Sequence, residues 1–328
     1  MATWSCTNDR LTTLIVGGGG FIGSHLVKLL AERGSRNIIV AGRQPCPRFP
    51  IPGDARYVQG DINNAGILCG LLDQCDEVID LAYATVPKTS FDDPVLDVLS
   101  NLPPSVALLR EAARSRLRRF ILVSSGGTVY GNAKHLPIDE CHPTNPISPY
   151  GITKLALEKY AQMYCCLEGL PAIIVRPGNA YGIHQLGNLS QGFVGASIHA
   201  TLQGKEVKLF GQRGTTRDYV FVTDLAEGIY AALEHGIVGE TYNIGTGIGL
   251  NNRDVLDVLD SVAHPFGYSV KTKILPERAF DVSANVLSSD RLTSVSGWHP
   301  RTTFEEGIRL TWQWALTAEL SRENSVLR

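Results

Sequence analysis

The chain has 328 residues, of which 44% are hydrophobic and 19% charged, so it can bury one large domain or two unequal ones. A formal net charge of -2 without a long block of one sign gives no reason to expect nucleic acid or an anionic membrane as the main partner. The 7 cysteines lack CxxC or Cys/His metal spacing, which indicates neither a disulfide framework nor a bound metal. Residues 1–10 lack the apolar core of a signal peptide and no stretch reaches the ~20 apolar residues that span a bilayer, so we expect a cytoplasmic protein with a small-molecule partner.

Short aliphatic runs alternate with amphipathic segments through the first half of the chain. Expected strands lie at 14–16, 37–40, 57–58, 77–81, 120–123 and 172–175, and expected helices include 24–32, 106–115 and 153–167. Continuous apolar strands that alternate with helices predict a parallel sheet covered on both faces. We therefore predict a doubly wound α/β domain of the Rossmann type over residues 1–177.

The alternation becomes less regular after Pro177. A stretch rich in Gly, Asn and Gln precedes short expected strands near 207–210 and 242–243 and helices near 224–233, 253–263 and 303–315. We interpret residues 178–328 as a smaller C-terminal α/β lobe for the substrate, with no clear linker. Residues 218–245 are a candidate segment for a return to the large sheet.

A glycine-rich run follows the first expected strand directly, and a segment of helical period comes after it. The run is Gly17-Gly18-Gly19-Gly20-Phe21-Ile22-Gly23. Glycines at 17, 20 and 23 allow a tight turn, close approach of the main chain to a pyrophosphate, and close packing of helix on strand. Because the run lies between a strand and a helix, it predicts a dinucleotide site more strongly than glycines alone would.

The identity of the dinucleotide is less clear from the sequence than its presence. The acidic residue that usually holds the adenosine ribose is missing, and the second expected strand ends Val40-Ala41-Gly42-Arg43. Arg43 can clamp a 2′-phosphate, which favours NADP, or stack on adenine in an NAD enzyme. Asp61, after the third strand, is either an acceptor for the adenine amino group or the N-cap of a helix.

A tyrosine and a lysine share one face of the helix that begins Pro149-Tyr150-Gly151-Ile152-Thr153-Lys154. The i, i+4 spacing places Tyr150 and Lys154 one turn apart. A nearby ammonium stabilises phenolate, lowers the tyrosine pKa from its usual ~10, and can bind the nicotinamide ribose. We therefore predict that Tyr150 is a general base, although this spacing is common on helix surfaces and depends on the upstream glycine loop for its weight.

A Ser/Thr/Gly run at 124–131 follows another expected strand. The carboxyl ends of strands are where open α/β sheets bind ligands, so hydroxyl groups here can bridge a substrate to Tyr150. The alternative interpretation is an ordinary solvated loop.

Several motifs occur in the order expected for one known family. They are GGGGFIG at 17–23, GDI at 60–62, SSGGTVYG at 124–131, SPYGITK at 148–154, RPGNAYG at 176–182, RDYVFVTDL at 217–225 and YNIGTGIG at 242–249. On these motifs the chain resembles the extended short-chain dehydrogenase/reductases, and within them the UDP-glucose (UDP-galactose) 4-epimerase-like enzymes of the NAD-dependent epimerase/dehydratase family. The likeness covers residues 14–314 and implies NAD, a UDP-sugar substrate and a homodimer formed through helices at 94–115 and 153–167.

The resemblance also implies functions for individual residues. Tyr150 would be the acid/base, Lys154 the partner that lowers its pKa, and Ser125 the hydroxyl that completes the triad. Cofactor contacts are implied for Gly17, Gly20, Phe21, Ile22, Gly23, Arg43, Asp61, Ile62, Leu81, Ala82, Ala84, Asn101, Tyr150, Lys154 and Pro177. Substrate contacts are implied for Thr85, Ser125, Thr128, Tyr150, Asn179, Phe193, Val194, Phe210, Arg217, Arg278 and Asn285, with the arginines suited to a diphosphate.

The chain departs from the family pattern at three further places. Gly126 occupies the position where many epimerases carry a catalytic Ser or Thr, so Ser125 is expected to act instead, with Thr128 in reserve. Asn101 is followed by Leu-Pro-Pro-Ser rather than by the usual Val-x-Gly-Thr. Asn285 matches a variable position near the sugar and is smaller than tyrosine, which suggests that an N-acetylated hexose can enter.

The resemblance implies reversible epimerisation at C4 through a transient 4-keto sugar. One alternative is an NADP-dependent 4-ketoreductase acting on a nucleotide-linked deoxysugar, which Arg43 favours. Another is a non-catalytic dinucleotide-binding sensor, which the intact Ser125, Tyr150 and Lys154 disfavour. A 4,6-dehydratase is disfavoured because Gly126-Gly127 stand where that group carries an Asp-Glu couple.

Overall fold

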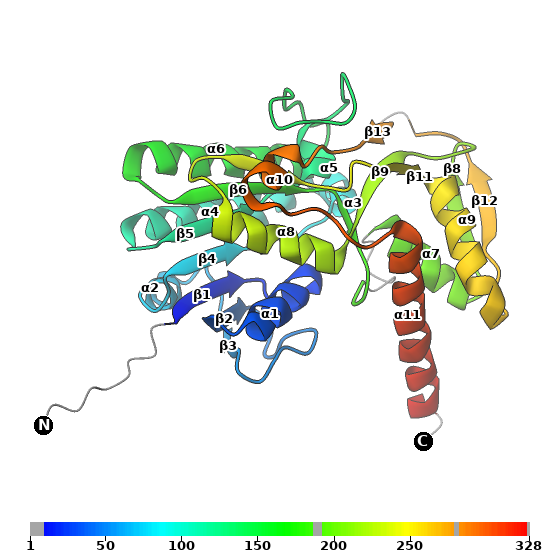
Figure 1. Ribbon diagram of the computed structural model, residues 1–328, viewed down its shortest axis with the longest axis horizontal. Helices are drawn as coiled ribbons and strands as arrows, with labels where there is room; N and C mark the ends of the chain where they lie inside the picture. The colour runs from blue at the N-terminus through cyan, green and yellow to red at the C-terminus, as the bar shows by residue number, and fades with distance from the viewer. Residues whose placement is uncertain (1–9, 186–191, 279–281, 327–328) are drawn as a thin grey trace, which may run out of the picture.

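The computed structural model describes residues 10–185, 192–278 and 282–326. A 7-stranded sheet with the order β10-β6-β5-β4-β1-β2-β3 forms its centre, and each neighbouring pair is parallel (Figure 1). The strands are β1 (Leu11–Val16), β2 (Arg36–Gly42), β3 (Arg56–Gln59), β4 (Glu77–Asp80), β5 (Arg119–Val123), β6 (Ala172–Pro177) and β10 (Thr241–Ile244).

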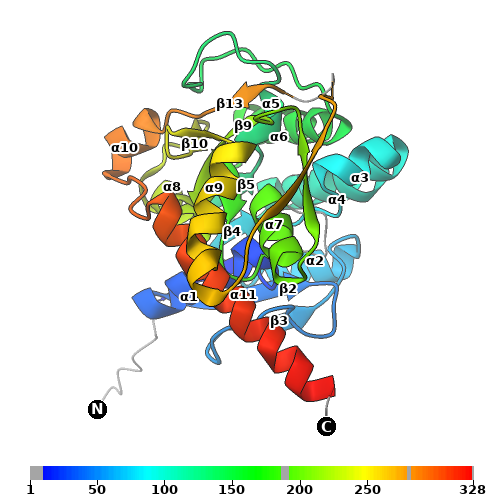
Figure 2. The ribbon, with the colours of Figure 1, turned by 90° about the vertical axis from the view of Figure 1, so that its right-hand side faces the viewer.

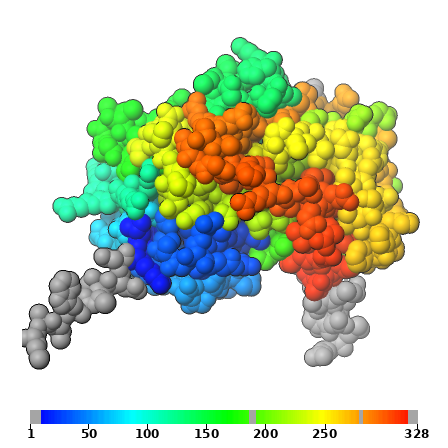
Figure 3. All heavy atoms as spheres, viewed as in Figure 1, coloured from blue at the N-terminus to red at the C-terminus, as the bar shows by residue number. Residues whose placement is uncertain are grey.

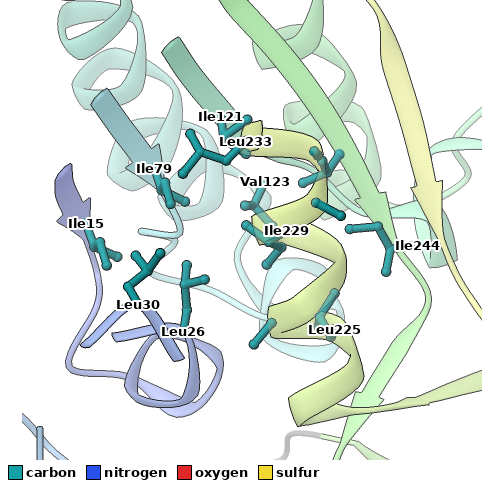
Figure 4. Packing of buried hydrophobic residues seen from close by; sticks show 14 of the residues in the cluster. Ile15, Leu26, Leu30, Ile79, Ile121, Val123, Leu225, Ile229, Leu233 and Ile244 are labelled. Carbon is teal, nitrogen blue, oxygen red and sulfur yellow. The ribbon is translucent and has the colours of Figure 1, made fainter. Parts of the chain in front are cut away.

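Helices cover both faces of this sheet. One face carries α1 (Phe21–Arg33) and α8 (Val222–His235), and the other carries α2 (Ala65–Leu72), α4 (Pro94–Arg114) and α6 (Pro149–Glu168). Alternation along β1 explains the two layers, because Ile15 packs with α1 and α8 whereas Leu14 and Val16 pack with the opposite helices. Figure 4 shows the first of these cores, where Leu26 and Ile229 meet from α1 and α8. The predicted doubly wound α/β fold is confirmed.

The smaller lobe has its own core and its own sheets. A 4-stranded sheet contains β11 (Gly249–Asn251), β9 (Thr216–Phe221), β13 (Ala284–Asn285) and β7 (Asn179–Tyr181), and β8 (Glu206–Phe210) pairs with β12 (Lys271–Leu275). The helices α7 (Phe193–Leu202), α9 (Asn252–Ala263) and α11 (Phe304–Val326) pack around these strands (Figure 2). Aromatic side chains fill the core between them, including Tyr181, Phe221 and Trp312.

The chain passes between the two lobes more than once. It enters the small lobe after β6, returns through α8 and β10, and then builds β11 to β13 before α10 (Asp290–Ser296) packs on α8. From α10 onward it crosses the surface from the large sheet to α11 (orange to red in Figure 3). Within the segment 218–245, β9 therefore belongs to the small sheet while α8 and β10 belong to the large one.

Within the described residues, no helix has the length and apolar character needed to cross a membrane. The same part of the chain holds no cluster of His, Cys, Asp or Glu side chains suited to a metal ion.

Candidate active site

The glycine run forms a tight loop between β1 and α1. Gly17 adopts a left-handed conformation with φ of 80°, which favours glycine. A Cβ atom on Gly23 would lie 2.5 Å from the Cα of Gly18, so α1 can pack this closely on the loop only without a side chain there. A Cβ atom on Gly20 would have one neighbour within 4 Å among the described residues, the Gly17 carbonyl oxygen at 3.3 Å, so the outer side of Gly20 is open. The N-terminus of α1 thus offers main-chain N–H groups to an anion.

A cavity of about 510 Å³ opens in front of this loop. It runs along the carboxyl ends of β1, β2, β4 and β5, where an open α/β sheet binds its ligand. Every residue predicted to contact the dinucleotide lines it: Gly17, Gly20, Phe21, Ile22, Gly23, Arg43, Asp61, Ile62, Leu81, Ala82, Ala84, Asn101, Tyr150, Lys154 and Pro177.

Asp61 lies in the cavity wall and does not cap a helix. Its Oδ1 accepts hydrogen bonds from the main-chain N of Asn63 (3.0 Å) and from Asn63 Nδ2 (2.9 Å). The N-cap of α2 is Asn64, whose side chain accepts from the main-chain N of Gly66 and Ile67. The N-cap interpretation of Asp61 is therefore wrong, because α2 begins three residues later than that interpretation requires.

Tyr150 stands at the first turn of α6 with its ring facing the cavity. Ser148 caps this helix, Pro149 occupies its first turn, and the Tyr150 main-chain N donates to Ser90 Oγ on α3 (Pro87–Asp92) at 3.1 Å. Burial raises the pKa of Tyr150 above its usual value, and repulsion from Asp97 raises it further. The hydrogen bond with the Ser125 side chain acts in the opposite direction.

Lys154 is buried one turn further along α6. Its ammonium donates to the carbonyl oxygen of Val123 at 2.8 Å and lies 5.9 Å from the centre of the Tyr150 ring. Burial lowers the pKa of Lys154 to about 8, against the attraction of Asp80, Glu158 and Asp97. The predicted lowering of the Tyr150 pKa is therefore wrong, because desolvation and Asp97 dominate at the phenol.

Asn101 secures the loop that follows β4. Its Oδ1 accepts from the main-chain N of Ala84 at 2.6 Å, and its Nδ2 donates to Thr85 Oγ1 at 3.1 Å and to the Asp97 carbonyl at 2.7 Å. The fully buried Asp97 carboxylate accepts from the Thr85 hydroxyl and, at 2.7 Å, from the Thr153 hydroxyl on α6. Asp97 thus links the cavity loop to the catalytic helix, and no sequence motif identified it.

Three of the predicted substrate residues surround the short helix α5 (Gly126–Val129), which begins after Ser125. Thr128 lies on α5, and Asn285 Nδ2 donates to the Gly126 carbonyl at 3.0 Å from β13. A Cβ atom on Gly127 would lie 3.1 Å from Asn179 Oδ1. The Asn285 Oδ1 is buried without a hydrogen-bond partner in the described residues, so this atom can accept a bond from a ligand.

Five further predicted substrate residues lie in the small lobe, outside the residues that line the cavity. Arg217 on β9 pairs in register with Asn285, and the Arg278 guanidinium stacks 4.0 Å from the centre of the Phe210 ring. Phe193 is partly buried, and Val194 is buried in the lobe core. A ligand could therefore meet Val194 only through its main chain. Of the predicted substrate residues, Thr85, Ser125 and Tyr150 line the cavity.

A stacked histidine joins the start of the small lobe to the large one. His184 has a φ of 73°, stacks on Phe49 at 4.4 Å and lies 5.7 Å from Trp314 on α11. Its Nδ1 lies 3.1 Å from Ser24 Oγ on α1. Burial, followed by repulsion from His25 and Lys28, lowers the pKa of His184 to about 4. His184 is therefore neutral at pH 7, and no motif predicted it.

A parallel sheet with a glycine loop and a Tyr/Lys pair in one cavity defines the short-chain dehydrogenase/reductase class of enzymes. The model of the NAD-dependent epimerase/dehydratase family matches residues 13–245. UDP-glucose 4-epimerase of Mycolicibacterium smegmatis is 33% identical over 307 residues, which covers 92% of this chain and 97% of that protein.

Two solved structures extend the likeness to the fold. UDP-glucose 4-epimerase from Thermotoga maritima, solved with UDP-glucose, has a TM-score of 0.88 at 30% identity and covers 94% of this chain and 100% of its own. The Thermus thermophilus enzyme, solved with NAD, has a TM-score of 0.86 at 32% identity with the same coverage. The chain belongs to the NAD-dependent epimerase/dehydratase family, and the predicted family, enzyme class and NAD cofactor are confirmed.

Proposed function

We propose that this enzyme inverts the C4 hydroxyl of a UDP-hexose reversibly, with UDP-glucose and UDP-galactose or their N-acetylated forms as substrates. One observation carries the proposal: Ser125, Tyr150 and Lys154 line the same cavity as the dinucleotide loop. The UDP-glucose 4-epimerases that resemble the chain along nearly its whole length support the choice of substrate class.

The cavity suits NAD on structural grounds. The open side of Gly20 and the N-terminus of α1 suit a pyrophosphate. Arg43 and Asp61 line the cavity after β2 and β3, where they would border the adenosine. When bound, NAD would supply hydride transfer from and to the sugar C4. The chain's own residues orient the sugar and move the hydroxyl proton.

In its phenolate form Tyr150 receives the C4 hydroxyl proton and later returns it, while the Ser125 hydroxyl hydrogen-bonds the phenolate oxygen. Lys154 holds the nicotinamide ribose and supplies positive charge at the cavity wall. Asn179, Phe193, Val194, Phe210, Arg217 and Arg278 hold the uridine diphosphate, which keeps the nucleotide fixed while the sugar turns over. Thr85, Thr128 and Asn285 border the hexose.

Turnover without additives tests the proposal. The purified enzyme should interconvert UDP-glucose and UDP-galactose without added cofactor, and its released dinucleotide should be NAD. Stoichiometric consumption of NADPH would instead establish the 4-ketoreductase that Arg43 favours. Absence of turnover on every UDP-hexose, with a bound dinucleotide, would favour the sensor.

The hexose itself is a second question for the same assay. Asn285 is compact and its Oδ1 has no partner in the part of the chain that the structure describes, so we expect UDP-N-acetylglucosamine to be accepted. A strong preference for UDP-glucose over UDP-N-acetylglucosamine would contradict this part of the proposal.

A homodimer through α4 and α6 completes the proposal. These helices expose apolar side chains to solvent, with Val95, Leu99 and Leu167 between 63% and 76% exposed and Ile152 at 56%. Exposed apolar side chains on two packed helices favour association with a second copy. Sedimentation of a dimer, converted to a monomer by Leu99→Glu, is the expected result, and a monomeric wild type would contradict it.

A further inference from the structure

Tyr83 lies against both members of the catalytic pair. It belongs to the loop after β4 and lines the cavity. Its ring meets the Tyr150 ring edge-on, with centres 4.8 Å apart and planes at 65°. The Lys154 ammonium lies 4.1 Å from the centre of the Tyr83 ring, nearer than it lies to the Tyr150 ring. One side chain therefore contacts both the phenol and the ammonium.

The ammonium of Lys154 is buried, and its other contacts replace only part of the water that it has lost. Within the described residues it makes one hydrogen bond, to the Val123 carbonyl, although an ammonium has three donors. The carboxylates of Asp80 on β4, Asp97 on α4 and Glu158 on α6 attract it, and Glu158 is itself bound by Arg176 on β6. The face of the Tyr83 ring borders the ammonium, and Tyr83, like Val123 and Tyr150, also lines the cavity.

We propose that Tyr83 is a positioning residue whose ring holds the Lys154 ammonium by a cation–π contact and braces the Tyr150 ring beside it. The proposal rests on the function proposed above for its kinetic consequence. Such a contact stabilises a cation more strongly the further water is excluded from it. The ring thus opposes the loss of the Lys154 proton that burial favours.

The phenol hydroxyl of Tyr83 does not carry this function. It faces Asp97 and Thr153 without a hydrogen bond of regular geometry to either, and its oxygen is buried. Burial and the Asp97 charge raise the pKa of Tyr83, so this phenol stays protonated at neutral pH. Phenylalanine at position 83 should therefore preserve the contact, whereas leucine or methionine should remove it.

Lysine NMR tests the proposal without turnover. The holoenzyme, labelled with ¹³C at the lysine ε carbon, is titrated with pH, and the Lys154 signal is assigned by its absence in Lys154→Arg. Its pKa of about 8 should stay within a few tenths of a unit in Tyr83→Phe. In Tyr83→Leu and Tyr83→Met it should fall by about one unit, which is the size of a partly desolvated cation–π contact. An unchanged Lys154 pKa in both aliphatic variants would overturn the proposal.

The pH profile of epimerisation is the second measurement. Because the charged form of Lys154 is lost above its pKa, activity should decline on the alkaline side, and the midpoint should move down by about one unit in Tyr83→Leu. Tyr83→Phe should keep the wild-type profile, whereas its loss of activity to the level of Tyr150→Phe would overturn the proposal. A wild type without turnover would refute the proposed function, while the NMR titration would still decide about Tyr83.

Discussion

The cofactor side and the substrate side of the proposed site are built in different ways. On the cofactor side, predicted residues from one continuous α/β unit line a single cavity, and main-chain geometry at Gly17 and Gly23 shapes it. On the substrate side, Arg217, Arg278 and Phe210 come from short strands and loops of the small lobe, and they do not line that cavity. The shape of the backbone thus determines the cofactor side, whereas the substrate side depends on side chains that several separate segments bring together.

This difference predicts which substitutions should affect cofactor binding and which should affect substrate binding. A change in the glycine loop alters the backbone and should affect folding and cofactor together. A change of an arginine in the small lobe removes one charge-assisted contact and should affect the substrate alone. Tyr150 lies between the two sides, so Tyr150→Phe, which keeps the ring, should affect chemistry more than either binding step.

The largest effect is expected for Tyr150→Phe. This change removes the group that carries the C4 hydroxyl proton, and we expect kcat to fall by about 10³-fold with the dinucleotide retained. The matched control is Tyr160→Phe on the exposed side of the same helix, which should leave kcat unchanged. Comparable activity of Tyr150→Phe and wild type would remove Tyr150 from the mechanism.

The next effect is expected for Gly23→Ala. The added Cβ would lie 2.5 Å from the Gly18 Cα, and since both atoms belong to packed backbone, relief requires α1 to shift. We expect the free energy of unfolding to fall by about 1–3 kcal/mol and copurified dinucleotide to be lost.

The control for this change is Gly70→Ala in α2, where a Cβ meets nothing within 4 Å. That variant should match or exceed the wild-type stability, because alanine favours a helix over glycine. Urea unfolding and cofactor content by absorbance measure both variants. Normal cofactor content in Gly23→Ala would show that close packing of α1 on the glycine loop is not required for cofactor binding.

A smaller effect is expected for Arg217→Ala. Loss of a charge-assisted contact to a diphosphate should raise KM for the UDP-sugar by about 10–100-fold while the dinucleotide content stays unchanged. Arg309→Ala is the control, because Arg309 pairs with Glu306 on the exposed face of α11. If KM for UDP-sugar is unaffected by Arg217→Ala, the small lobe does not hold the diphosphate in the way proposed.

The smallest effect concerns pH and the contact of His184 with Phe49 and Trp314. The folded state keeps His184 neutral down to a pKa of about 4, whereas the unfolded chain takes up the proton near 6.5. The contribution of neutral His184 to the free energy of unfolding is therefore fully present above about pH 6.5. It declines as the pH falls toward 4, by about 1–2 kcal/mol after allowance for partial exposure.

His184→Asn tests this contribution, because asparagine tolerates the left-handed backbone and does not titrate. The difference in unfolding free energy between pH 7 and pH 5 should be smaller in the variant than in the wild type. Equal differences in the two proteins would show that protonation of His184 does not destabilise the contact.

Much of the cofactor side could be predicted from sequence because its determinants are local. The strand, glycine loop and helix around Gly17 are contiguous, and the spacing of Tyr150 and Lys154 fixes their shared face. The sequence did not identify the N-cap of α2, because two nearby residues are both suited to cap a helix. Asp61 and Asn64 are both good caps, and only the start of α2 decides between them.

Residues that act across long sequence distances could not be predicted. Asp97 reaches Thr153 across 56 positions, and Ser90 reaches Tyr150 across 60. Tyr83 shows no periodicity or motif that distinguishes it from an ordinary loop residue. The raised pKa of Tyr150 also depends on burial and on Asp97, and neither is visible in the spacing of the SPYGITK motif.

The repeated passage of the chain between its lobes has a consequence for engineering. A cut after Pro177 would remove β10, which is the edge strand of the large sheet beside β6, together with α8. The Asp218 carboxylate also accepts from the main-chain N of Thr246 (2.8 Å) and Leu287 (3.1 Å), which lie in two separate later segments. Chimeras that transplant a new substrate specificity therefore need several splice points, because exchange of the C-terminal half as one block would also replace α8 and β10 of the large sheet.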